Sequence, residues 1–224
     1  MKKFRKMVAA IAATTIALAS LTTVSFSASA ATKSSYDTYR VYVDLEPASG
    51  MQHSYVVIYT TRQTFQTDSI VKGNVAGDLR IYGSAGDKWI ANVRYFDTTA
   101  DVTDGGTLYR QNFCTNRDVG NFNKIEDLQD ILYVGFNETK NSSGNVISPN
   151  PVTVSAVLVG DVNNDNVVNW QDVTVLNNHL SGTNVLTGNA LRAADTNNDG
   201  YVNNADLSIL INYASGSIQN FLMD

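Results

Sequence analysis

Residues 161–182 read DVNNDNVVNWQDVTVLNNHLSG, and residues 195–216 read DTNNDGYVNNADLSILINYASG. The second stretch repeats the first at an offset of 34 residues, and 11 of the 22 aligned positions are identical. Most of the shared residues carry oxygen in a short side chain, and several of them alternate along the chain. This is the ligand pattern that a hard cation requires.

Each repeat opens with a loop whose spacing is that of an EF-hand calcium loop. Such a loop takes ligands from positions 1, 3, 5, 7, 9 and 12, of which position 7 supplies a backbone carbonyl. The ligands expected in the first loop are Asp161, Asn163, Asp165, the carbonyl of Val167, Asn169 and Asp172. Those expected in the second are Asp195, Asn197, Asp199, the carbonyl of Tyr201, Asn203 and Asp206. All donors are oxygens in a flexible loop, so we expect two Ca²⁺ ions rather than Zn²⁺, Cu²⁺ or Mg²⁺.

Two positions in the loops depart from the common EF-hand. Position 6 makes a sharp turn, and it is Gly200 in the second loop but Asn166 in the first, a residue that tolerates positive φ. Position 12 is Asp instead of Glu, so the shorter arm either weakens bidentate binding or closes the loop more tightly. The alternative is a pair of Asn- and Asp-rich turns without metal, which two compatible loops at a fixed offset disfavour.

A short helix is expected after each loop. Apolar residues recur there at i, i+3 and i+7: Val173, Leu176 and Leu180, then Leu207, Leu210 and Ala214. Gly182 and Gly216 stand where a C′ glycine ends a helix. Residues 157–159 read as extended, so no helix precedes the first loop and each repeat is half an EF-hand. Residues 184–194 can form a short connecting helix. So small a helical domain is expected to take much of its folding free energy from the metal.

The duplicated Asp-x-Asn-x-Asp-x-x-x-Asn-x-x-Asp loop, each copy followed by a helix ending in Gly, resembles a type I-like dockerin of cellulosome or amylosome proteins. The resemblance covers residues 158–224. It implies two calcium ions and insertion into a cohesin module of a scaffold protein. The recognition positions it implies are Trp170, Gln171, Asn177 and Asn178 in the first repeat and Asn204, Ala205, Ile211 and Asn212 in the second. Because the two sets differ, we expect one dominant docking orientation anchored by Trp170, unless that side chain packs on its own module.

Residues 1–30 read as a signal peptide. Four basic residues among the first six precede an apolar run to about residue 21, and Ala28-Ser29-Ala30 gives the small-residue cleavage pattern. Thr14, Thr15 and Ser20 interrupt the run and disfavour a membrane anchor, and no other stretch approaches the roughly 18 apolar residues of a spanning helix. We therefore expect a secreted protein without a membrane span, and the dockerin resemblance implies that it belongs to a bacterial cell-surface complex.

The acidity of the chain is concentrated in the repeats. The whole chain carries 16 basic and 21 acidic side chains, for a net charge of −5, whereas residues 158–224 hold seven Asp and one Arg. Six of those seven Asp are predicted calcium ligands. Nucleic acids and anionic membranes require clustered Lys and Arg, so neither is an expected partner. The one cysteine, Cys114, excludes a disulfide framework and is expected to be a buried apolar residue.

Residues 31–157 have a different pattern. Apolar and polar residues alternate in about seven short runs separated by turn signals, at residues 39–45, 55–60, 79–82, 89–96, 107–113, 131–136 and 152–159. This pattern predicts an antiparallel β-sandwich, so the expected fold is a β-sandwich followed by a small α domain. Residues 125–131 are expected to form one short turn of helix and residues 137–151 a loop.

The β-sandwich is expected to bind plant polysaccharide rather than to catalyse, by fold-level analogy. Its only histidine, His53, does not lie in a nucleophile elbow. Its acidic residues stand mostly among Thr, Gly and polar turn residues, although a glycosidase needs only two carboxylates. Candidates for stacking on sugar rings are Tyr82, Trp89, Tyr95 and Tyr109, with alternation favouring the core for Trp89. Two alternatives remain: an adaptor whose sandwich binds another protein, as a cohesin does, and a small polysaccharide-degrading enzyme.

Overall fold

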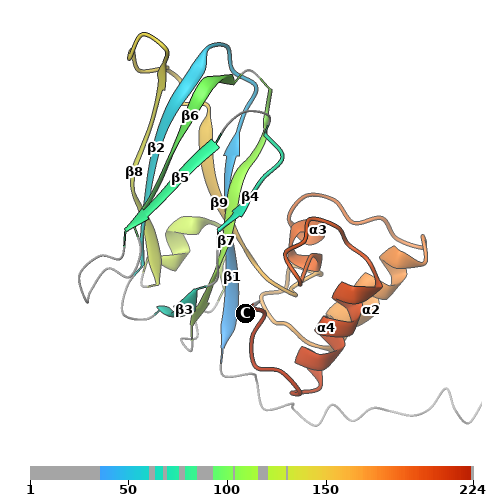
Figure 1. Ribbon diagram of the computed structural model, residues 1–224. Helices are drawn as coiled ribbons and strands as arrows, with labels where there is room; N and C mark the ends of the chain where they lie inside the picture. Colours follow the sequence, from blue (N-terminus) through green and yellow to red (C-terminus); the bar gives the residue numbers. More distant parts are fainter. Residues whose placement is uncertain are drawn as a thin grey trace, which may run out of the picture. The chain divides into compact units, whose positions relative to one another are not determined.

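The computed structural model has two antiparallel sheets in its N-terminal part and three helices in its C-terminal part (Figure 1). It describes residues 36–60, 64–67, 70–75, 79–84, 93–102, 104–115, 121–129 and 131–222. The predicted signal peptide and Trp89 lie outside these residues. The strands are β1 (Asp37–Leu45), β2 (Met51–Thr60), β3 (Thr64–Thr67), β4 (Val71–Lys72), β5 (Leu79–Ser84), β6 (Val93–Val102), β7 (Gly106–Thr115), β8 (Leu132–Asn141) and β9 (Val152–Leu158). The helices are η1 (Ile125–Leu128), a 3₁₀ turn, and α2 (Trp170–Leu180), α3 (Gly188–Ala194) and α4 (Asn204–Ala214).

The two sheets share one hydrophobic core. One sheet has the order β3-β7-β1-β9, with β4 also paired to β7, and the other has the order β5-β6-β2-β8. Every described pairing between these strands is antiparallel. Val41 of β1, Ile58 of β2, Phe113 of β7 and Leu132 of β8 belong to the same buried cluster. The N-terminal part is therefore an antiparallel β region whose sheets are joined by apolar side chains.

Strand β1 is buried along both of its faces. Val41 and Val43 alternate with Arg40 and Tyr42, as the two-residue period of a strand requires. The valines enter the core between the sheets, whereas Tyr42 packs with Val157 and with Ala193 of α3. The outer face of β1 is thus covered by the helical part of the chain.

Each of the seven predicted runs overlaps a strand, although several bounds differ and residues 89–92 of one run lie outside the described residues. The short strands β3 and β4 were not predicted, because neither carries a long alternating pattern. Residues 137–151 were expected to be a loop, and this expectation is wrong for residues 137–141. They continue β8, because β2 is long enough to pair with them from Val56 to Met51. The predicted turn of helix is η1, and Cys114 is fully buried.

The helical part is built on α2 and α4, which pack against each other. Its buried cluster includes Leu176 of α2, Leu210 of α4, Leu186, Tyr213 and Phe221. Both helices end as predicted, with Gly182 and Gly216 at positive φ. Only Val159 and Gly160 separate β9 from the first loop, so the β region passes into the helical part without a linker. Residues 32–224 form one compact unit.

The last described residues close this unit. Phe221 is 1% exposed, and its ring stacks on Tyr213 with the centroids 4.3 Å apart. Its backbone N–H donates to Thr38 Oγ1 at 3.1 Å, and its carbonyl accepts from Asn112 Nδ2 at 3.4 Å. Phe221 therefore ties the end of the helical part to strands β1 and β7.

We predict that Phe221→Ala lowers the free energy of unfolding by about 3–5 kcal/mol, the usual cost of emptying a buried phenylalanine site. Urea unfolding followed by far-UV circular dichroism measures this loss. The exposed Val146→Ala serves as the control and is expected to leave the midpoint unchanged. A wild-type midpoint for Phe221→Ala would show that this segment does not stabilise the unit.

Candidate functional site

The two repeated loops have nearly the same internal hydrogen bonds. In the first, the carboxylate of Asp161 accepts from the backbone N–H groups of Asp165 at 3.0 Å and Asn166 at 2.9 Å. In the second, the carboxylate of Asp195 accepts from Asp199 and Gly200, each at 3.1 Å. The first carboxylate of each loop thus draws the loop backbone around itself.

The last carboxylate of each loop links the loop to its helix. Asp172 is fully buried and accepts from the backbone N–H groups of Val162 at 2.8 Å and Asn169 at 2.8 Å. Asp206 occupies the same place in the second loop and accepts from Asn197 and Asn203. Each of these residues is the N3 member of a capping box that begins α2 or α4. A residue predicted as a metal ligand therefore also fixes the start of a helix.

Both loops make the predicted sharp turn. Asn166 has φ 67° and Gly200 has φ 91°, so position 6 is left-handed in each loop. Asn164 and Asn198, at position 4, also have positive φ, which the sequence pattern had not indicated. Asn is among the non-glycine residues that enter this region most readily. The Asn-rich composition of the loops is thus a requirement of their backbone.

Burial of the carboxylates favours a positive partner. Asp161 and Asp195 are each 5% exposed, and Asp172 and Asp206 are 0% exposed. Desolvation raises the pKa of Asp172 to about 6 and also raises the pKa of Asp161. An ionised carboxylate out of water is costly unless it is paired, and the backbone N–H donors only partly offset this cost. The oxygen-only donor set and its burial fit a hard cation such as Ca²⁺.

The carboxylates are not already gathered as a metal cluster. Across the described ranges, no three Asp, Glu, His or Cys side chains form such a group. Instead, Asn163 Nδ2 donates to Asp165 Oδ2 at 2.8 Å, and Asn197 Nδ2 donates to Asp199 Oδ2 at 2.8 Å. To hold a cation with their amide oxygens, Asn163 and Asn197 would have to withdraw these N–H donors from the carboxylates. Such rearrangement is expected of a site whose formation is coupled to metal binding.

The β region contacts the second loop through a buried arginine. Arg40 of β1 is fully buried, and its Nη1 donates to the carbonyl oxygen of Asp195 and lies 3.5 Å from Asp195 Oδ2. Its Nε donates to Asn112 Oδ1 at 2.7 Å. Desolvation still raises the pKa of Asp195, but Arg40 and Arg110 oppose that rise. The first residue of the second loop thus has a cationic partner from the β region.

Two further contacts hold the loops against the β region. Arg110 of β7 donates through Nε to Asn198 Oδ1 and through Nη2 to the Asn198 carbonyl at 2.9 Å. The backbone N–H of Phe122 donates to Asn166 Oδ1 in the first loop at 3.1 Å. Sequence reasoning missed Arg40, Arg110 and Asn198, because no local pattern pairs residues 88 or 155 positions apart. The one available signal was that Arg40 and Arg110 are charged residues within strands that otherwise alternate with apolar residues.

The recognition positions implied by the resemblance lie on the surface of the helical part. Seven of the eight are exposed, and Asn178 is half-buried. Trp170, at the start of α2, is 51% exposed, so it is not a core residue of its own module. Ile211 of α4 is 36% exposed. None of the contacts described above between the loops and the β region uses these positions.

Comparison with known families gives this helical part a class. Residues 159–214 match the family model of the dockerin type I domain, so the C-terminal part of this chain is a type I dockerin domain. Dockerin domains bind calcium and dock onto cohesins in extracellular, cellulosome-type complexes. Comparisons with curated proteins and with solved structures found no match. The helices of the described part of the chain lack the length and apolar character of a membrane-spanning segment.

We predict that Arg40→Met destabilises the metal-depleted protein by about 3 kcal/mol, since it leaves the Asp195 carboxylate buried without its cationic partner. The loss should be smaller in calcium, which supplies another positive charge to that carboxylate. Urea unfolding in chelator and in excess Ca²⁺ measures both values. Lys140→Met, which breaks the ion pair with Glu138 on the surface, is the control and should change neither. Equal losses in both solutions would show that Arg40 acts by packing alone.

Proposed function

We propose that this protein is an exported, non-catalytic subunit of a cellulosome-type complex. Residues 1–30 act as its signal peptide, residues 31–157 form a β-sandwich that binds plant polysaccharide, and residues 158–224 dock onto a cohesin of a scaffold protein. The observation that carries the docking function is the pair of equivalent loops with buried carboxylates, each continuing into a helix with an exposed recognition surface. The dockerin match supports the same partner.

The dockerin holds two calcium ions, one in each loop. The side chains of Asp161, Asn163, Asp165, Asn169 and Asp172, with the Val167 carbonyl, would hold the first. The second would be held by Asp195, Asn197, Asp199, Asn203 and Asp206, with the Tyr201 carbonyl. Bound calcium would supply the positive charge that the buried carboxylates lack. The protein's own part is to bend each loop at Asn166 or Gly200 and to start each helix from Asp172 or Asp206.

Docking uses one surface of α2 and α4 in one dominant orientation. Trp170 and Gln171 begin the first helix, whereas Asn204 and Ala205 begin the second. A half-exposed tryptophan is a strong candidate for an interface anchor, because Trp is enriched among residues that contribute most of the binding energy. The corresponding Asn204 cannot bury a comparable apolar area. The first repeat is therefore the main contact with the cohesin.

The second candidate function is that of an adaptor whose β region binds another protein. It is supported by the same antiparallel β region, which is of a kind that cohesins also have. Tyr109, one of the predicted sugar-stacking residues, is 1% exposed and belongs to the core, so it cannot contact a ligand. The side chains of Tyr82, Trp89 and Tyr95 are not among those described. Of the four predicted stacking residues, Tyr109 is therefore excluded from polysaccharide binding.

Removal of calcium is expected to abolish cohesin binding, because loops with uncompensated buried carboxylates do not hold α2 and α4 in place. Surface plasmon resonance of a chain starting at residue 31 against a panel of type I cohesins, with and without EDTA, measures this effect. Excess Ca²⁺ should restore binding, and Mg²⁺ at the same concentration should not. A complex that forms equally well in EDTA would contradict the calcium-dependent docking.

Substitution of the anchor tests the docking orientation. Trp170→Ala is expected to weaken cohesin binding at least about tenfold, the effect of removing one interface anchor. Asn204→Ala, at the equivalent position of the second repeat, is the matched control and should change the dissociation constant less than threefold or so. If Asn204→Ala abolishes binding and Trp170→Ala does not, the second repeat is the main contact.

A further inference from the structure

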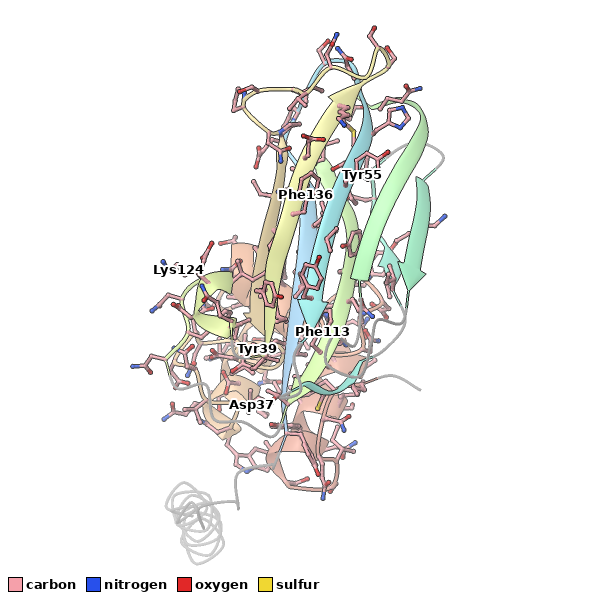
Figure 2. All side chains as sticks on the ribbon, turned by 90° about the vertical axis from the view of Figure 1, so that its left-hand side faces the viewer. Asp37, Tyr39, Tyr55, Phe113, Lys124 and Phe136 are labelled. Carbon is pink, nitrogen blue, oxygen red and sulfur yellow. The ribbon has the colours of Figure 1, made fainter. Side chains whose placement is uncertain are left out.

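The outer face of the four-stranded sheet carries a row of exposed aromatic side chains. Tyr55 is 38% exposed, Tyr133 is 40% exposed and Phe136 is 46% exposed. Figure 2 looks onto β8 and β2, and Tyr55 and Phe136 lie on the side of these strands that faces the viewer. Together with Val57 and Tyr59, these residues make up the aromatic strip. A contiguous apolar surface of this kind on a globular protein commonly marks an interaction site.

The strand period and an irregularity in β8 produce the strip. Val56 and Ile58 of β2 point into the core, so Tyr55, Val57 and Tyr59 face outward. The pairing shifts between Val57, opposite Phe136, and Ile58, opposite Val134, which leaves Gly135 as the extra residue in β8. A bulge of this kind re-aims the neighbouring side chain. Here it adds Phe136 to the outer face, where the strand would otherwise turn this residue inward.

Gly135 also makes room for the ring of Tyr59. A Cβ at this position would lie 2.0 Å from Cε2 of Tyr59, so the tyrosine ring occupies the space that any side chain would need. The rings of Tyr59 and Tyr133 are 20° from parallel, with their centroids 5.0 Å apart. Their positions on paired strands fix these rings in the free protein. Little side-chain ordering would therefore be needed on binding.

The charges beside the strip neutralise each other. Lys140 Nζ lies 2.9 Å from Glu138 Oε1 and 5.8 Å from the centre of the Tyr55 ring. The strip offers aromatic faces and phenolic hydroxyls, and the ion pair beside it adds no net charge. Along β2, Tyr55 and Tyr59 are separated by four residues, or roughly 13 Å. An extended, uncharged ligand with apolar faces and many hydroxyl groups is complementary to such a surface.

We propose that the aromatic strip of Tyr55, Val57, Tyr59, Tyr133 and Phe136 is the surface on which the β region binds a neutral polysaccharide. The inference rests on the proposed function and adds to it the residues that make the contact. The apolar C–H faces of consecutive sugar rings lie against the aromatic rings, and the sugar hydroxyls bond to the phenolic oxygens and to the Glu138–Lys140 pair. The strip takes the sugar-stacking role that the sequence suggested for Tyr109, which lies in the core.

Binding isotherms on insoluble cellulose and insoluble starch test the proposal, with the whole chain from residue 31. We expect binding to at least one of them and a loss of at least about tenfold for Phe136→Ala and for Tyr133→Ala, because each removes the apolar contact area of one ring. Tyr133→Phe keeps the ring and should retain most of the affinity. Val146→Ala, an exposed apolar residue outside the strip, is the matched control. Thermal unfolding of each variant checks that the exposed substitutions leave the fold intact.

The outcomes separate the site from the function. If the wild-type protein binds neither polysaccharide, polysaccharide binding itself is wrong, while docking to cohesins is unaffected. If it binds and the strip variants bind equally well, only the assignment of the strip is wrong. Sedimentation that reveals a dimer lost in Phe136→Ala would overturn the proposal in favour of a second copy of this chain. Loss of a protein partner in the strip variants, without polysaccharide binding, would favour the adaptor.

Discussion

The constraint on which the helical part depends is the burial of carboxylates. The first and last Asp of each loop are nearly inaccessible to water, and an ionised carboxylate in that position needs compensating positive charge. Backbone N–H groups supply part of this positive charge. Donation from the N–H groups of Asn166 and Gly200 to the first Asp of each loop forces these two residues to positive φ. The same carboxylates start α2 and α4 through Asp172 and Asp206. Loop shape, helix position and the placement of the recognition surface thus follow from one electrostatic requirement.

This requirement is met differently in the two loops, although their sequences are so similar. Among the described residues, two guanidinium groups of the β region bond to the second loop, whereas the first loop accepts a hydrogen bond from the neutral backbone N–H of Phe122. Arg40 reaches Asp195 only because β1 is covered on its outer face by the helical part. The β region is therefore part of the environment of the second loop. The opposite sheet keeps its outer face exposed at Tyr133 and Phe136.

The sequence allowed the repeated loops, the helices and the approximate position of seven strands to be predicted, because each depends on local spacing. The sharp turns at Asn166 and Gly200 followed from the same spacing. Contacts such as Arg40 with Asp195 could not be predicted, since they depend on how distant segments pack. The strip was also missed, because alternation defines two faces of a strand without telling which is buried. Phe136 faces outward through the bulge at Gly135, which reverses the expected alternation.

The proposed calcium ions, one in each loop, are what holds the helical part in its dockerin fold. Isothermal titration calorimetry of the metal-depleted chain with Ca²⁺ is the decisive measurement, because it counts the ions bound. We expect two ions per chain, and we expect Asp161→Ala and Asp195→Ala each to reduce the number to one. A single bound ion in the wild-type protein, or none, would show that calcium does not hold both loops.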